Sequence, residues 1–147
     1  MIPKAAESKT VMDTQLIKTN VSTDRNKLAL GGYDPTSYWR GGPVKGNPAI
    51  CTHHNGAVYH FASKANKARF LAAPGAFLPE YGGYCATAVS EGKIYPGDPT
   101  RYKITDDRLF LFCEDHGGDT RPTWEENELA RSAAADRNWN NTLADLR

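Results

Sequence analysis

The chain has no long hydrophobic run, and none of its apolar stretches approaches the roughly 18 residues that a transmembrane helix needs. It also has almost no net charge, because 18 Lys and Arg residues face 17 Asp and Glu residues. Binding to nucleic acid or to an anionic membrane through charge needs a basic excess, so we expect neither partner. The first 27 residues lack the apolar segment of a signal peptide, which predicts a cytoplasmic protein, or a periplasmic or secreted one if a leader was removed.

Cysteine is scarce, and its spacing excludes several common sites. Cys51, Cys85 and Cys113 form no C-x-x-C pair, which argues against zinc ribbons and thioredoxin-like centres. Two alternatives stay open for Cys51 and Cys113. They pair if they lie on neighbouring strands, or they are small buried side chains, which is the interpretation we favour. Motifs of catalytic triads, phosphate-binding loops, HExxH zinc enzymes and EF-hands are also absent from the sequence.

The length of 147 residues fits one domain, within which three segments differ in composition. Residues 1–27 form a polar N-terminal arm without a regular hydrophobic period. Residues 28–113 form a compact core. Residues 114–147 form a linker and a C-terminal helix that we expect to pack on the core. We identify no internal repeat.

Two turn sequences predict β-hairpins inside the core. Asn55-Gly56 and Asp106-Asp107 each separate two runs rich in apolar or aromatic residues. The last of these runs is apolar on both faces, so we expect it to be buried on both sides. The strands are expected at 49–53, 57–61, 101–105 and 108–113.

Capping residues predict short helices around the hairpins. We expect them at 34–38, after Ser63, and over 84–91. Thr123 and Glu126 match a capping box, which predicts a long helix from there to about Leu146. Hairpins and helices in mixed order predict an α+β fold, with a small antiparallel sheet of two hairpins packed with short helices and a long C-terminal helix.

The chain contains the motifs Tyr33-Asp-Pro-Thr-Ser-Tyr38, Asn55-Gly-Ala-Val-Tyr-His-Phe-Ala-Ser63, Pro79-Glu-Tyr-Gly-Gly-Tyr-Cys-Ala86 and Asp136-Arg-Asn-Trp139. Together these motifs resemble the YHS domain family, and the resemblance covers about residues 28–139. The short members of that family accompany heavy-metal transporters, and their three cysteines are thought to hold metal. Those cysteines correspond here to Ser37, Ala62 and Asn66, so that site is not carried over. The chain is more similar to the stand-alone members.

Cys85 is the main candidate functional residue. It follows two glycines and a tyrosine and should begin a helix, where unpaired N–H groups favour the thiolate form. A thiolate is a soft metal ligand or a nucleophile. His60 is a candidate second ligand, although strand alternation places it on the face opposite Tyr59 and Phe61. A small aromatic pocket near Cys85 is the other candidate site, with Tyr59, Tyr81, Tyr84, Gly82 and Gly83 as its lining.

These observations lead to one expected function and two alternatives. We expect a non-enzymatic binding domain of the YHS type that handles a transition metal ion (copper, zinc or iron) through Cys85, or that binds a small ligand. One alternative is a thiol-dependent enzyme or redox sensor in which Cys85 is activated. The other is a structural or interaction module without small-molecule chemistry, with Trp124 and Trp139 as candidates for an exposed apolar patch.

Overall fold

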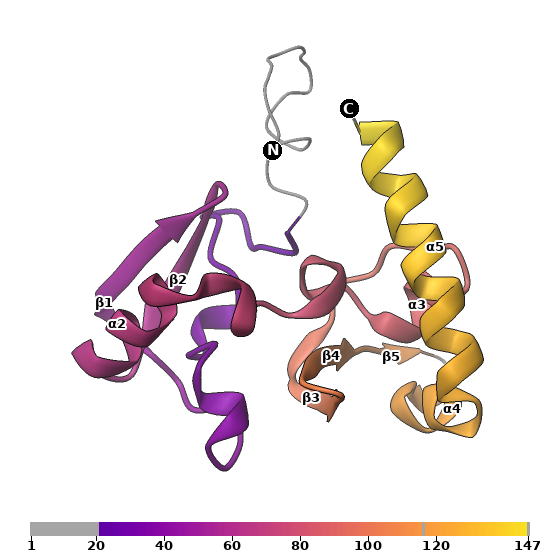
Figure 1. The fold of residues 1–147 in the computed structure, drawn as a ribbon, viewed down its shortest axis with the longest axis horizontal. Coiled ribbons are helices and arrows are strands. Elements are labelled where there is room, and N and C mark those ends of the chain that lie inside the picture. Colours follow the sequence, from indigo (N-terminus) through magenta and orange to yellow (C-terminus); the bar gives the residue numbers. More distant parts are fainter. Residues whose placement is uncertain (1–20, 116, 147) are drawn as a thin grey trace.

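The structure, a computed structural model, describes residues 21–115 and 117–146. It has the expected mixed α+β architecture, in which β-hairpins pack with short helices and a long C-terminal helix (Figure 1). The first 20 residues of the predicted N-terminal arm lie outside the described residues. The rest of that arm contacts the body of the protein, because the Ser22 N–H donates to the Gly82 carbonyl at 2.8 Å.

Both predicted hairpins are confirmed. Strands β1 (Asn47–His54) and β2 (Ala57–Phe61) pair antiparallel, as do β3 (Asp98–Thr105) and β4 (Arg108–Phe112). The turn residues Asn55, Gly56, Asp106 and Asp107 all have positive φ, as tight hairpin turns require. The hairpins are separate two-stranded sheets, however, and do not join into one sheet. The described residues contain a third, very short pair, β5 (Glu114–Asp115) and β6 (Gly118–Asp119).

Short helices connect and cover the hairpins. Helix α2 (Lys64–Ala72) begins as predicted after Ser63, whose side chain accepts the Asn66 N–H. Helix α3 (Ala86–Ser90) begins after Cys85. Four 3-10 helices complete this set: η1 (Leu30–Gly32), η2 (Ser37–Trp39), η3 (Pro74–Ala76) and η4 (Glu80–Gly83).

The C-terminal segment forms two helices where we expected one. Helix α4 (Arg121–Glu126) begins after Thr120, so the prediction that Thr123 caps the helix is wrong. Pro122 explains the earlier start, because proline is well suited to the first turn of a helix. Asn127 leaves the helical region with φ of −155°, and the long helix α5 (Glu128–Leu146) follows it.

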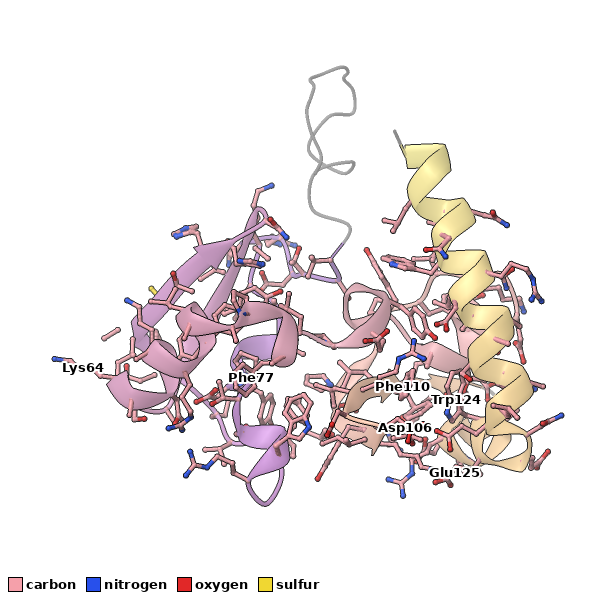
Figure 2. The ribbon with its side chains drawn as sticks, viewed as in Figure 1. Lys64, Phe77, Asp106, Phe110, Trp124 and Glu125 are labelled. Carbon is pink, nitrogen blue, oxygen red and sulfur yellow. The ribbon has the colours of Figure 1, made fainter. Side chains whose placement is uncertain are left out.

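Strand β4 is buried on both faces, as predicted, and it joins two hydrophobic cores. Leu109 and Leu111 belong to a core built with the first hairpin and α2. Phe110 and Phe112 belong to a second core, and Figure 2 shows Phe110 beside Trp124. That second core includes Tyr81, Ala86, Val89, Trp124 and Ala135 and is covered by α4 and α5.

The two hairpins belong to two repeated units, which corrects the expectation of a chain without internal repeats. Each unit begins with a Gly-Gly-Tyr turn, at 31–33 in the first and 82–84 in the second. Each then enters its hairpin through similar tripeptides, Gly46-Asn-Pro48 and Gly97-Asp-Pro99. We call residues 30–62 the first unit and residues 81–113 the second unit. They correspond position by position without an insertion.

The backbone geometry of the two units matches closely. The residue before each Gly-Gly pair, Leu30 or Tyr81, has φ of 57°, a value that side chains seldom adopt. The first strand of each hairpin carries an irregularity at the same place, after Asn47 and after Asp98. The matching hydrogen bonds run from the Gly46 N–H to the Gly32 carbonyl at 2.8 Å and from the Gly97 N–H to the Gly83 carbonyl at 3.1 Å.

Candidate functional site

A cavity of about 230 Å³ lies where the two units meet, and we call it the interunit cavity. The Gly-Gly turns of both units line it, through Gly31 on one side and Gly82 and Gly83 on the other. Tyr59 of β2 and Leu111 of β4 also line it, so residues from both hairpins shape the same space. The repeat of the Gly-Gly turn therefore creates a hollow that neither unit forms alone.

The predicted aromatic pocket is only partly the interunit cavity. Tyr59, Gly82 and Gly83 line the cavity as expected. Burial raises the pKa of Tyr59 to about 12, so its phenol stays neutral at physiological pH. Tyr81 and Tyr84 lie elsewhere, with ring centroids 6.2 and 6.0 Å from that of Trp139 on α5.

The lining of the interunit cavity is mostly apolar. Val21, Leu28 and Pro96 contribute to it together with the leucine and tyrosine named above. Apart from the Tyr59 phenol, its polar side chains come from a single stretch, Ser22 to Asp24, which is partly exposed. An apolar wall with few polar groups at an accessible edge suits a small organic molecule better than an ion.

The Cys85 thiol is fully buried, and both its sulfur and its proton have hydrogen-bond partners. Its sulfur accepts the Cys113 N–H at 3.2 Å and the Ala88 N–H at 3.5 Å. The Thr120 hydroxyl lies 3.4 Å away and donates its only proton to the Cys113 carbonyl at 2.8 Å. The Cys85 S–H is therefore the donor to the Thr120 oxygen. The niche of this sulfur is polar but closed to solvent.

Cys113 brings a second thiol to this niche, which our sequence reasoning missed. It is half-buried directly after β4, and its sulfur lies 3.9 Å from the Thr120 hydroxyl oxygen. Burial raises the pKa of Cys113, and hydrogen bonding to the Cys85 thiol raises it further. The contact between Cys85 and Cys113 depends on a parallel bridge between Cys85 and Leu111, which no local sequence pattern predicts.

The alternative of a Cys51–Cys113 pair is wrong. Cys51 lies in β1 of the first unit, directly opposite His60 of β2. All three cysteines are free thiols in the structure. Cys51 lies in the first hairpin and Cys113 directly follows the second, and because those hairpins form separate sheets the two residues are not cross-strand neighbours.

His60 occupies the expected face of β2. It is half-buried, while its neighbours Tyr59 and Phe61 point into the core. Gly46 passes so close that a Cβ there would lie 2.5 Å from the His60 carbonyl carbon. Within residues 21–115 and 117–146, the polar contacts of the Cys85 sulfur are with Thr120, Ala88 and Cys113, not with His60.

The described part of the chain holds no cluster of three or more His, Cys, Asp or Glu residues arranged to bind a metal ion. None of its helices has both the length and the apolar content needed to cross a membrane. Comparison of the chain with protein-family models, curated proteins and solved structures finds no match.

The proposed aromatic surface patch is also corrected. Trp124 is fully buried, with its ring centroid 5.0 Å from that of Phe110 and 5.9 Å from that of Phe112. Trp139 is half-buried against Tyr81 and Tyr84. Both tryptophans attach the C-terminal helices to the second core, which leaves neither as a free anchor for a partner.

Proposed function

We propose that this chain is a stand-alone domain of the YHS type with a non-enzymatic binding role, and that its binding site is the interunit cavity. The observation that carries this proposal is the cavity itself, which both Gly-Gly turns and Tyr59 line. Three residues of that lining, Gly31, Gly82 and Gly83, carry no side chain.

The size and lining of the interunit cavity indicate the class of ligand. Its volume of about 230 Å³ is below the roughly 300–1,000 Å³ of sites for drug-sized molecules. We therefore infer a small, largely apolar molecule, comparable to a single fused aromatic ring system. Polar atoms on such a ligand would face the stretch from Ser22 to Asp24.

Protein-detected NMR with indole as the probe tests this proposal. We expect saturable amide shifts centred on Gly31, Gly82 and Gly83. Ser22→Trp should abolish them, because Ser22 lines the cavity with a partly exposed side chain and the new ring would fill the space. Asn26→Trp is the matched control, since Asn26 is an exposed residue of the same segment outside the cavity lining. Shifts that do not saturate, or that survive Ser22→Trp, would contradict the proposal.

Metal handling is a second candidate function, and the neighbouring thiols of Cys85 and Cys113 favour it. Soft thiolate ligands select Cu(I), which two sulfurs suffice to bind. Structural zinc sites usually need four ligands, and the described residues bring no third His, Cys, Asp or Glu to the pair. Of the three metals expected from the sequence, we therefore propose copper as Cu(I).

Competition with a chromogenic Cu(I) chelator tests this second candidate. The wild-type chain and Cys51→Ser should each bind one Cu(I), whereas Cys113→Ser should lose at least tenfold in affinity. Cys51→Ser is the control because Cys51 lies in the first unit, away from the pair. Equal affinity of Cys113→Ser and the wild type would refute the site.

A further inference from the structure

The thiols of Cys85 and Cys113 form a pair of unequal accessibility. Cys85 is 0% exposed, whereas Cys113 is half-buried at the end of β4. The backbone nitrogen of Cys113 lies 3.2 Å from the Cys85 sulfur, and both sulfurs lie within 4 Å of the same Thr120 hydroxyl oxygen. The Cys113 sulfur is carried by the residue whose backbone already contacts the Cys85 sulfur, and rotation about the Cα–Cβ bond of Cys113 changes the distance between the two sulfurs.

The backbone on both sides of this pair is already fixed. A parallel bridge joins Cys85 to Leu111, two residues before Cys113. The Thr120 hydroxyl and N–H both bond the Cys113 carbonyl, which holds the chain after β4 in place. A bond between the sulfurs would therefore connect two segments that are neighbours in the reduced protein, which limits the strain that poor disulfide geometry imposes.

We propose that Cys85 and Cys113 form a reversible disulfide, with Cys113 as the entry thiol and Cys85 as the resolving thiol. The oxidant is a low-molecular-weight disulfide. Cys113 loses its proton and attacks one sulfur of that disulfide, so a mixed disulfide forms and one small thiol leaves with the proton. Cys85 then loses its proton and attacks the Cys113 sulfur, which releases the second small thiol. The protein loses two electrons and two protons, and the small disulfide is reduced to two thiols.

The accessibility of the two sulfurs sets this order. A small disulfide in solution can reach the half-buried Cys113 but not the enclosed Cys85. The new bond would close the chain from α3 to the end of β4, a loop that contains the whole second hairpin. This inference does not depend on the interunit cavity. It also predicts that the oxidised protein does not bind Cu(I) at this pair, because the disulfide offers no thiolate.

The test uses the full chain as Cys51→Ser, which retains only Cys85 and Cys113. The protein is equilibrated with mixtures of reduced and oxidised glutathione, trapped with a maleimide and examined by mass spectrometry. We expect a species about 2 Da lighter that takes up no maleimide, and its reduction should restore both thiols. Thermal denaturation should show a midpoint higher by roughly 5–10 °C in the oxidised form.

The intermediate gives a second and independent measurement. In Cys51→Ser combined with Cys85→Ser, the mixed disulfide on Cys113 should persist because no resolving thiol remains. Two free thiols at every glutathione ratio would overturn the proposal. So would a glutathione adduct that accumulates on Cys113 while Cys85 is present, or a wild-type disulfide that includes Cys51.

Discussion

Cys85 occupies in the second unit the position that Asp34 occupies in the first. The Asp34 carboxylate accepts the Ala62 N–H just after β2, and the Cys85 sulfur accepts the Cys113 N–H just after β4. Both residues are fully buried directly after a Gly-Gly-Tyr turn. Each side chain therefore ties the turn of its unit to the far end of the hairpin, one with a carboxylate and the other with a thiol.

We expect Asp34→Ala to be among the most destabilising substitutions in the first unit. The carboxylate accepts hydrogen bonds from Thr36, through both its N–H and its hydroxyl, from Ala62 and from Asn66. Removing it leaves the two buried Thr36 donors and the partly buried Ala62 and Asn66 donors without this acceptor, which should lower the free energy of unfolding by about 3 kcal/mol or more. Urea denaturation measures this loss. Asn66→Ala, which removes one of these donors, should cost clearly less, and equal costs would contradict the assignment.

Gly97→Ala should destabilise the protein through steric overlap. A Cβ at Gly97 would lie 2.6 Å from the Gly83 carbonyl oxygen and 2.7 Å from the Leu111 Cβ. Because both neighbours are fixed by the fold, we expect a cost of about 2–3 kcal/mol in urea denaturation. Gly75→Ala is the control, since no described atom lies within 4 Å of a Cβ there. A change within about 0.5 kcal/mol is expected for that control, and a similar loss for both variants would count against the close approach.

Trp124→Ala should separate the C-terminal helices from the second core. The indole is fully buried between Phe110 and Phe112, and its N–H donates to Glu128 at 2.8 Å. Loss of this volume should cost about 3–5 kcal/mol by thermal or chemical denaturation. Leu129→Ala is the matched control on α5, because Leu129 is 86% exposed and its truncation should change stability by less than about 0.5 kcal/mol.

Glu128 should make stability depend on acid pH. Burial pushes the pKa of Glu128 upward, but hydrogen bonds from Lys103, Trp124 and Thr105 outweigh burial and hold the pKa below its ordinary value of 4.5. A lowered folded-state pKa gives a contribution that is fully present above pH 4.5 and lost as the pH falls through the folded-state pKa.

Glu128→Gln should therefore be less stable than the wild type at pH 7, by about 1–2 kcal/mol, with the difference shrinking below pH 4.5. Denaturation curves at a series of pH values measure this difference. Glu126→Gln, an exposed change at the end of α4, is the control, and its stability should stay close to that of the wild type at every pH. A constant difference for Glu128→Gln across the series would argue against the ionised contact.

Local signals were sufficient to predict most of the secondary structure. Asn55-Gly56 and Asp106-Asp107 determine their hairpins because the turn geometry needs positive φ, which these residues tolerate. Ser63 begins α2 through a single side-chain bond. The capping-box pattern from Thr123 predicts a later start of α4 than the structure has, because Pro122 allows the helix to begin one turn earlier.

The repeat and the thiol pair needed the three-dimensional structure. Between the units, only short motifs such as Gly-Gly-Tyr are shared, and the hairpins that carry the similarity have different side chains. The neighbours of Cys85 are set by strand register, so the approach of Cys113 follows from pairing over a long stretch of chain. The expectation that Tyr81 lines the pocket is wrong, because the Tyr81 hydroxyl donates to Asp136 on α5, away from the cavity.

Strand β4 should make the protein unfold in a single cooperative transition. Its even-numbered and odd-numbered side chains serve different cores, so the first core cannot keep Leu109 and Leu111 in place once the second has lost Phe110 and Phe112. The two cores should therefore unfold together, even though each has its own hairpin and its own covering helices. Calorimetry should record a single transition whose van't Hoff and calorimetric enthalpies agree, where two independent units would melt in succession.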